Sequence, residues 1–269
     1  MADPTPVAGS EPDVWAGAAY LGAPATVPEA VAAGRVLRVP RWGLADVVIL
    51  VVAVLFVPTL ILSVALAMGV SRTGGAFLLL AAATPWIVFA GWPLLTTHLQ
   101  GNGVRIDLGY VFRRSDIGWG IGGGVACFVL ATPVGWLTEK IFGDFDSAAG
   151  NAAAQSTAPR WVLVLYALMV SIGAPLIEEL AFRGLVFGAV AKYASGRGES
   201  LRAIMIWAGF WATVLFAGIH LEPVRIPVLL VIGAVLSYLR IRTGRVGASV
   251  IAHSLNNIPG ALGIALLGL

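Results

Sequence analysis

Two adjacent glutamates and an arginine lie inside an otherwise apolar run, at residues 175–183. Ionisable side chains at the centre of a bilayer cost about 2.5–3.5 kcal/mol each, so this cluster requires partners or a water-filled cavity. Neighbouring helix residues diverge by about 100°, whereas Glu179 and Arg183 are four residues apart and can pair. The spacing predicts a supporting Glu179–Arg183 ion pair and leaves Glu178 as the free carboxylate, suited to a general base.

Two more polar intrusions follow in the apolar runs downstream. Phe216 and His220 are four residues apart, as are His253 and Asn257, so the members of each pair share a helix face. Glu178 lies about 24 Å of helix before the next polar loop, and His220 lies about 26 Å after that loop. An antiparallel hairpin therefore brings Glu178 and His220 to one depth, whereas the same count places His253 and Asn257 less deeply.

Two hydrolytic mechanisms suit these side chains. In the first, Glu178 and His220 activate a water that attacks a peptide carbonyl, and His253 with Asn257 stabilises the oxyanion. In the second, Glu178, His220 and His253 bind zinc or another divalent metal, whose bound water is the nucleophile. The first is favoured and requires no cofactor, because the Asn257 amide is a good donor but a poor zinc ligand. A purely structural role, joining helices, is the alternative for the two histidines.

The composition indicates a membrane protein. The chain has 269 residues, of which 58% are hydrophobic and 12% charged, against about 25% charged in soluble proteins. The apolar runs are continuous, which predicts an all-α, polytopic helical protein with about seven to eight transmembrane helices. The basic residues lie between these runs, which indicates membrane topology and not a nucleic-acid surface. The expected partners are the lipid bilayer and a protein or peptide substrate.

The chain divides into three predicted parts: a disordered tail (1–40), leading transmembrane helices (41–159) and a catalytic helical core (160–269). Arginines just ahead of the first apolar run predict a cytoplasmic N-terminus. Glycines at 118–124 predict a close approach of helices. The predicted spans are 44–70, 76–95, 117–137, 161–194, 203–221, 226–241 and 246–269.

The run 161–194 is too long for one upright span, since about 20 residues suffice. It forms either one long helix, kinked at Pro175, or a span followed by a half-span. A single crossing places all the basic loops on one face of the membrane, so the positive-inside rule favours one crossing and seven spans.

Three motifs resemble those of the CAAX prenyl endopeptidase, abortive-infection and bacteriocin-processing (CPBP) family of intramembrane proteases. The resemblance covers 161–269 and implies peptide-bond hydrolysis in the membrane, with the first glutamate and first histidine activating water. Family descriptions often name metalloproteases, whereas the prenyl-protein enzymes look glutamate-dependent. The motifs are Glu178-Glu179-x-x-x-Arg183, Phe216-x-x-x-His220 and His253-x-x-x-Asn257.

The expected location is a bacterial cell membrane, because an arginine-dominated, alanine-rich chain is typical of a GC-rich genome. The main alternative function is a non-catalytic adaptor, or a proton-coupled carrier, that uses the buried charged cluster to bind a partner or an ion. A carrier would more typically show inverted repeats with interrupted helices in both halves. Here the polar intrusions are confined to the second half of the chain.

Overall fold

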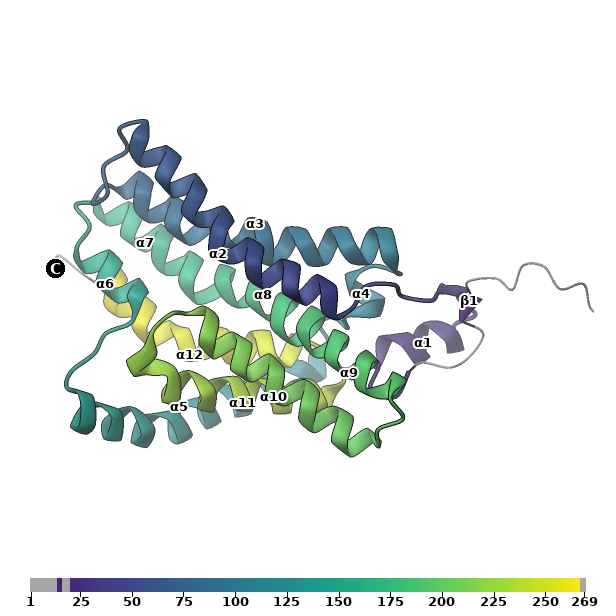
Figure 1. Ribbon diagram of the computed structural model, residues 1–269. Helices are drawn as coiled ribbons and strands as arrows, with labels where there is room; N and C mark the ends of the chain where they lie inside the picture. The colour runs from purple at the N-terminus through teal and green to yellow at the C-terminus, as the bar shows by residue number, and fades with distance from the viewer. Residues whose placement is uncertain (1–13, 16–19, 267–269) are drawn as a thin grey trace, which may run out of the picture.

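A computed structural model describes residues 14–15 and 20–266, and these residues form a bundle of long helices. Figure 1 shows the bundle with α6 at one end and α1 and α4 at the other. The predicted all-α, polytopic membrane fold is confirmed. A long central helix spans Arg160–Gly196. The other long helices are α2 (Leu44–Ala67), α3 (Gly75–Gln100), α5 (Arg114–Phe142), α10 (Leu201–Ile219), α11 (Ile226–Thr243) and α12 (Gly247–Ala265). The short elements are β1 (Val14–Trp15), α1 (Thr26–Ala32), β2 (Leu37–Arg38), α4 (Val104–Asp107), α6 (Ala148–Ala154) and the 3₁₀ turn η3 (Pro223–Arg225).

Among the described residues, six helical segments are long and apolar enough to cross a membrane. They correspond to the first six predicted spans. The seventh, α12, has 19 residues but is not among the six, since His253 and two asparagines interrupt its apolar run. Residues 267–269 of the predicted last span lie outside the described part of the chain.

The central helix is continuous from Arg160 to Gly196, so the interpretation as one long helix is correct and the half-span is absent. Two π-helical segments interrupt its regular winding. Such segments are rare and frequently mark functional sites, and here they enclose the two glutamates. In order, the helix consists of α7 (Arg160–Leu168), η1 (Met169–Gly173), α8 (Ala174–Glu179), η2 (Leu180–Val186) and α9 (Phe187–Gly196).

The second half of this central helix forms the middle of the apolar core. Figure 1 shows α8 and α9 between α2 and α10, in agreement with the contacts of α9 with both helices. Phe182 is 1% exposed, and its ring centroid lies 5.3 Å from that of Phe89 and 5.5 Å from that of Phe216. These rings join α3, η2 and α10, and tilted or edge-on aromatic pairs of this kind contribute about 0.5–1.5 kcal/mol each beyond their buried area.

The glycines of α5 allow the close packing that the sequence predicts. A Cβ atom added at Gly120 would lie 2.5 Å from Ile251 of α12, and one at Gly123 would lie 2.4 Å from Leu239 of α11. Both distances are shorter than real Cβ contacts, so α5 can approach α11 and α12 this closely only because those positions lack a side chain.

The prediction of a disordered tail over 1–40 is wrong for residues 20–40. These residues hold α1 and β2, and the side chains of Val27 and Leu37 are 2% exposed. Val27 and Leu37 belong to one apolar cluster with Ile106 of α4, so burial against a distant segment orders this part of the chain. Residues 1–13 and 16–19 of the predicted tail lie outside the described residues.

Candidate active site

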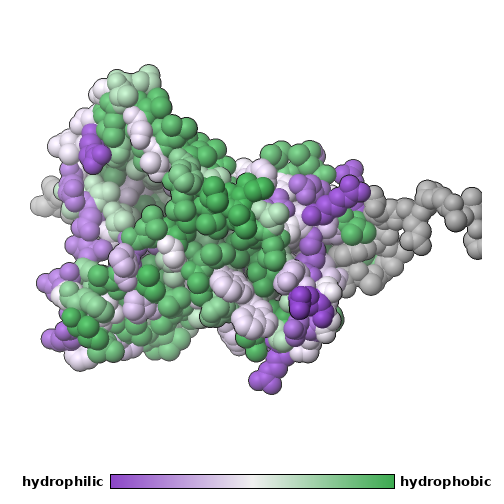
Figure 2. Space-filling model, in the orientation of Figure 1, coloured by the Kyte–Doolittle hydropathy of each residue, from purple (hydrophilic) through white to green (hydrophobic). Residues whose placement is uncertain are grey.

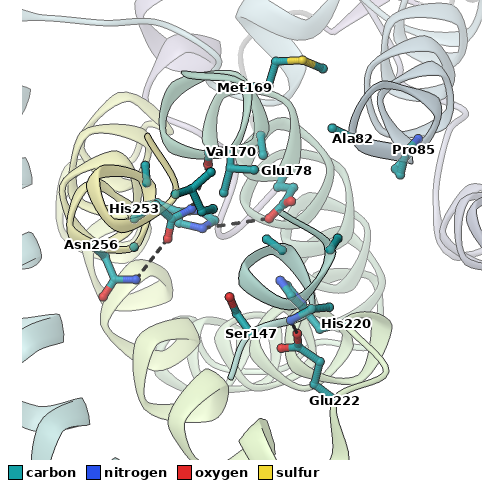
Figure 3. A pocket seen from close by; sticks show the side chains of 18 of the residues that line it. Ala82, Pro85, Ser147, Met169, Val170, Glu178, His220, Glu222, His253 and Asn256 are labelled. Carbon is teal, nitrogen blue, oxygen red and sulfur yellow. Dashed lines mark hydrogen bonds and ion pairs between the residues drawn. The ribbon is translucent and has the colours of Figure 1, made fainter. Parts of the chain in front are cut away.

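The four predicted catalytic residues line one cavity of about 640 Å³. Glu178 comes from α8, His220 directly follows α10, and His253 and Asn257 come from α12. The walls also include parts of α3, α6 and α11. Figure 3 shows Glu178 and His253 directed toward one another, with His220 on another side of the cavity.

Glu179 is fully buried and joins two of the sequence motifs. Its Oε1 accepts a hydrogen bond from Arg183 Nη1 at 2.9 Å, which is the predicted pair, and another from His253 Nδ1 at 2.9 Å. The Arg183 Nη2 atom donates to the Gly233 carbonyl of α11 at 2.9 Å. Since an ionised carboxylate only accepts, the His253 proton lies on Nδ1, and Nε2 is left for the cavity.

Glu178 is the more accessible carboxylate, with a side chain 19% exposed. Its Oε2 lies 4.0 Å from His253 Nε2. This distance is too long for a hydrogen bond and suits a bridging water. Among the described residues, a histidine nitrogen lies within 4.0 Å of a carboxylate oxygen in two places, and both of them involve His253. The structure therefore brings Glu178 and His220 to the same cavity, but the histidine nearest to Glu178 is His253.

His220 is held by its own helix. Its Nδ1 donates to the Phe216 carbonyl at 2.6 Å, which leaves Nε2 free. The Phe216 ring lies edge-on to both cavity histidines, with centroids 4.7 Å from His220 and 5.5 Å from His253. Leu221 follows in the left-handed region at φ 55°, a conformation that costs a non-glycine residue about 1–2 kcal/mol. Such strain is often found at functional sites.

Asn257 satisfies a carbonyl that the central helix leaves without a donor. Within η1 the Ala174 N–H donates five residues back to Met169, and Pro175 has no N–H to donate. The Val170 carbonyl instead accepts from Asn257 Nδ2 at 3.1 Å. The amide that was predicted to stabilise an oxyanion therefore joins α12 to η1.

Several cavity residues were missed by sequence reasoning. Asn256 lines the cavity and donates to Asn257 Oδ1 at 3.2 Å. Its position next to Asn257 in an apolar run was the available signal. Glu222 and Arg225 form an ion pair, and Glu222 also accepts from the Ala148 N–H at the start of α6. These two residues lie in the gap between the predicted spans 203–221 and 226–241.

The predicted metal ligands do not fit a metal centre in this arrangement. Among the described residues, no three His, Cys, Asp or Glu side chains lie close enough together to bind one ion. His253 uses Nδ1 to bind Glu179, and no approach within 4.0 Å links His220 to either glutamate.

Comparison with known proteins matches residues 160–259 to the family described as type II CAAX prenyl endopeptidase Rce1-like. This segment is similar to an Rce1-like domain. The predicted family is confirmed, and the matched residues include all four predicted catalytic side chains. At the level of the family, the Rce1-like match indicates a membrane-embedded protease. No curated protein and no solved structure matches the chain.

Proposed function

We propose that the chain is an intramembrane endopeptidase that cleaves a membrane-associated protein or peptide with a water held between Glu178 and His253. The observation that carries the proposal is the 4.0 Å separation of Glu178 Oε2 and His253 Nε2 at the cavity wall. A water at this place can donate one hydrogen bond to each acceptor. The Glu179 carboxylate supports the arrangement, because it fixes the His253 tautomer through Nδ1.

The reaction follows from these positions. The water oxygen attacks the carbonyl carbon of the substrate while Glu178 takes up the released proton. The resulting tetrahedral intermediate carries an oxyanion, which requires a donor. Collapse of the intermediate breaks the C–N bond, and Glu178 returns the proton to the leaving amine. Water is the only co-reactant, and the products are a carboxylic acid and an amine.

We assign His220 to the oxyanion. Its Nδ1 is engaged with the Phe216 carbonyl, so a protonated His220 donates from Nε2 into the cavity. The sequence predicts that His220 helps to activate the water and that His253 stabilises the oxyanion, so the present assignment exchanges these two roles. It also makes Asn257 a positioning residue, since its amide binds Val170. The proposal includes no metal. It is supported by the positions of the possible metal ligands, because no three His, Cys, Asp or Glu side chains of the described residues lie close enough together to bind one ion.

The test begins with comparison of the membrane proteomes of cells expressing the wild-type chain and Glu178→Ala, which identifies the substrate. Purified Glu178→Gln is then expected to lose cleavage of that substrate while remaining folded in detergent. Glu199→Gln, an exposed position at the other end of the bundle, is the matched control and is expected to retain activity. Cleavage by Glu178→Gln at the wild-type rate would refute the hydrolase. A non-catalytic adaptor or carrier would leave the two proteomes identical.

The histidine roles are separated by asparagine substitutions. Asparagine retains a hydrogen-bond donor, but its shorter side chain and less basic amide oxygen replace the imidazole Nε2 that accepts from the water. We expect His220→Asn to retain partial activity, with a loss within the 10²–10³-fold typical of a removed oxyanion donor. We expect His253→Asn to lose more. The reverse order would return the roles to the assignment made from the sequence. Activity that disappears on treatment with a chelator and returns with zinc would contradict the metal-free mechanism.

A further inference from the structure

We infer that the cavity opens to the non-cytoplasmic side of the membrane. If the chain is the endopeptidase proposed above, the bond that it cleaves lies in the non-cytoplasmic half of a membrane-spanning or membrane-anchored polypeptide. The orientation follows from where the cavity and the basic residues lie in the bundle.

The molecule has two polar ends separated by an apolar band. Figure 2 shows hydrophobic residues across the middle of the visible face and hydrophilic residues gathered at both ends. In Figure 1 one end carries α6, and the other carries α1 and α4. We call the first the α6 end and the second the α4 end. The apolar band is the part that the bilayer surrounds.

Basic residues are concentrated at the α4 end. All 17 lysines and arginines of the chain lie within the described residues. The α4 end, with the helix turns next to it, has Arg35, Arg38, Arg41, Arg105, Arg113, Arg114, Lys192, Arg197, Arg202, Arg240, Arg242 and Arg245. The α6 end has only Arg72, Lys140, Arg160 and Arg225, and Arg183 is inside the bundle. An excess of Lys and Arg in short loops marks the cytoplasmic side, so the α4 end is cytoplasmic.

The cavity belongs to the α6 half. Its polar rim consists of Ser147 before α6 together with Glu222 and Arg225, all at the end that lacks the basic excess. The central helix contributes wall residues only from its first half, ending at Glu178. Glu178 is also 18 residues from each end of that helix, which places the proposed base near the middle of the membrane with the open space on the α6 side.

The apolar core closes the cavity toward the α4 end. Immediately after the two glutamates, every residue of η2 is buried. Phe182 is 1% exposed, and Leu185 and Phe187 are fully buried. These packed side chains fill the core, so the cavity does not continue through it toward the α4 end. A substrate therefore reaches Glu178 from the α6 end or from the lipid beside it.

This geometry limits the substrate class. A prenylated CAAX sequence, which the family description names, would meet the closed α4 end if it were presented on the cytoplasmic face. The accessible substrate is a polypeptide whose scissile bond lies beyond the membrane midplane on the non-cytoplasmic side. The Ala, Pro and Trp side chains of α3 that line the cavity suit an apolar segment.

Orientation is testable without any assay of activity. Cys127 is the only cysteine and is buried, so single-cysteine variants carry one accessible thiol. We expect a membrane-impermeant maleimide to label Asp144→Cys in intact cells. We expect it to label Glu199→Cys only after the membrane is permeabilised. Both positions are exposed and lie outside the cavity. The opposite pattern, or equal labelling of both variants in intact cells, would overturn the inference.

The substrate side is tested by mapping new termini in membrane proteomes of cells that express the wild-type chain or Glu178→Gln. We expect termini that depend on Glu178 to fall in the non-cytoplasmic halves of membrane segments. Termini on the cytoplasmic side would overturn this inference while supporting the endopeptidase. Identical termini in both cells would refute the endopeptidase and with it the substrate class, and the labelling experiment would still decide the orientation.

Discussion

His253 Nδ1 donates to Glu179 Oε1 at 2.9 Å, and the same oxygen accepts from Arg183. One buried carboxylate therefore links α12 to the central helix and balances a fully buried guanidinium. Arg183 in turn donates to the Gly233 carbonyl of α11, so three helices depend on this connection. Glu179 is thus both a structural anchor and the group that directs His253 toward Glu178.

Substitution of the two glutamates is expected to separate stability from catalysis. Glu179→Gln leaves Arg183 buried without its counter-charge, and breaking a buried pair from one side costs about 3–5 kcal/mol. Glu178→Gln changes a partly exposed side chain and is expected to alter stability by no more than about 0.5 kcal/mol. Thermal unfolding of both proteins in detergent measures the difference. Equal losses of stability would contradict the anchor role of Glu179.

A double-mutant cycle tests the bond between Asn257 and Val170. Asn257→Ala leaves the Val170 carbonyl unsatisfied and is expected to cost about 1–3 kcal/mol of stability. Pro175→Ala restores a backbone N–H, which allows the helix to satisfy that carbonyl itself. The cost of Asn257→Ala is then expected to shrink in the Pro175→Ala background, with a coupling energy of about 1 kcal/mol. Strictly additive effects would show that Asn257 does not satisfy a carbonyl freed by the proline.

The bond between Asn257 and Val170 also shows where prediction from the sequence fails. Four-residue spacing and helix length correctly predict the Glu179–Arg183 pair and place Glu178 and His220 at one cavity, because both depend on regular helix geometry. The two π-helical segments alter the register on either side of the glutamates. Which partner each side chain meets across helices, including His253 with Glu179, depends on that altered register and cannot be derived from α-helical spacing.

The fold, too, could be predicted from the sequence only in part. Continuous apolar runs predict the membrane helices, because the bilayer requires about 20 apolar residues per span. The ordered segment 20–40 was missed, since its few apolar residues lie among Ala, Pro and Gly, and their burial depends on α4. Trp42, just beyond this segment, is fully buried and donates to Asp107, 65 residues later.

Two glycines of α5 make a matched pair for testing helix packing. A Cβ atom at Gly120 would lie 2.5 Å from Ile251 and 3.2 Å from the Ala248 carbonyl, whereas one at Gly122 would meet nothing within 4 Å. Overpacking costs about 1–3 kcal/mol, so Gly120→Ala is expected to lower the unfolding temperature. Gly122→Ala is expected to be neutral or to stabilise by up to about 1 kcal/mol through helix propensity. A loss of stability in both variants would show that the effect is not steric.

Asp107 is expected to make stability depend on pH, at a site outside the membrane-spanning helices. Its Oδ2 accepts from Trp42 Nε1 at 3.0 Å and from the Asn102 N–H at 2.6 Å, and its Oδ1 accepts from Asn102 Nδ2 at 2.9 Å. Burial nonetheless raises the pKa of Asp107 above its ordinary value. The folded state then binds the proton more tightly than the unfolded state, so this residue's contribution is largest below about pH 4 and is lost as pH rises through the folded pKa.

Asp107→Asn removes this titration, and it also places an amide N–H opposite one of the donors. The variant is expected to be less stable than the wild type by about 1–3 kcal/mol at low pH, where the wild-type carboxyl is protonated. The gap is expected to narrow as pH rises, because only the wild type then buries a charge. Unfolding temperatures of both proteins between about pH 4 and pH 7 measure the gap. A gap that widens with pH would mean that hydrogen bonds to the ionised carboxylate outweigh its burial.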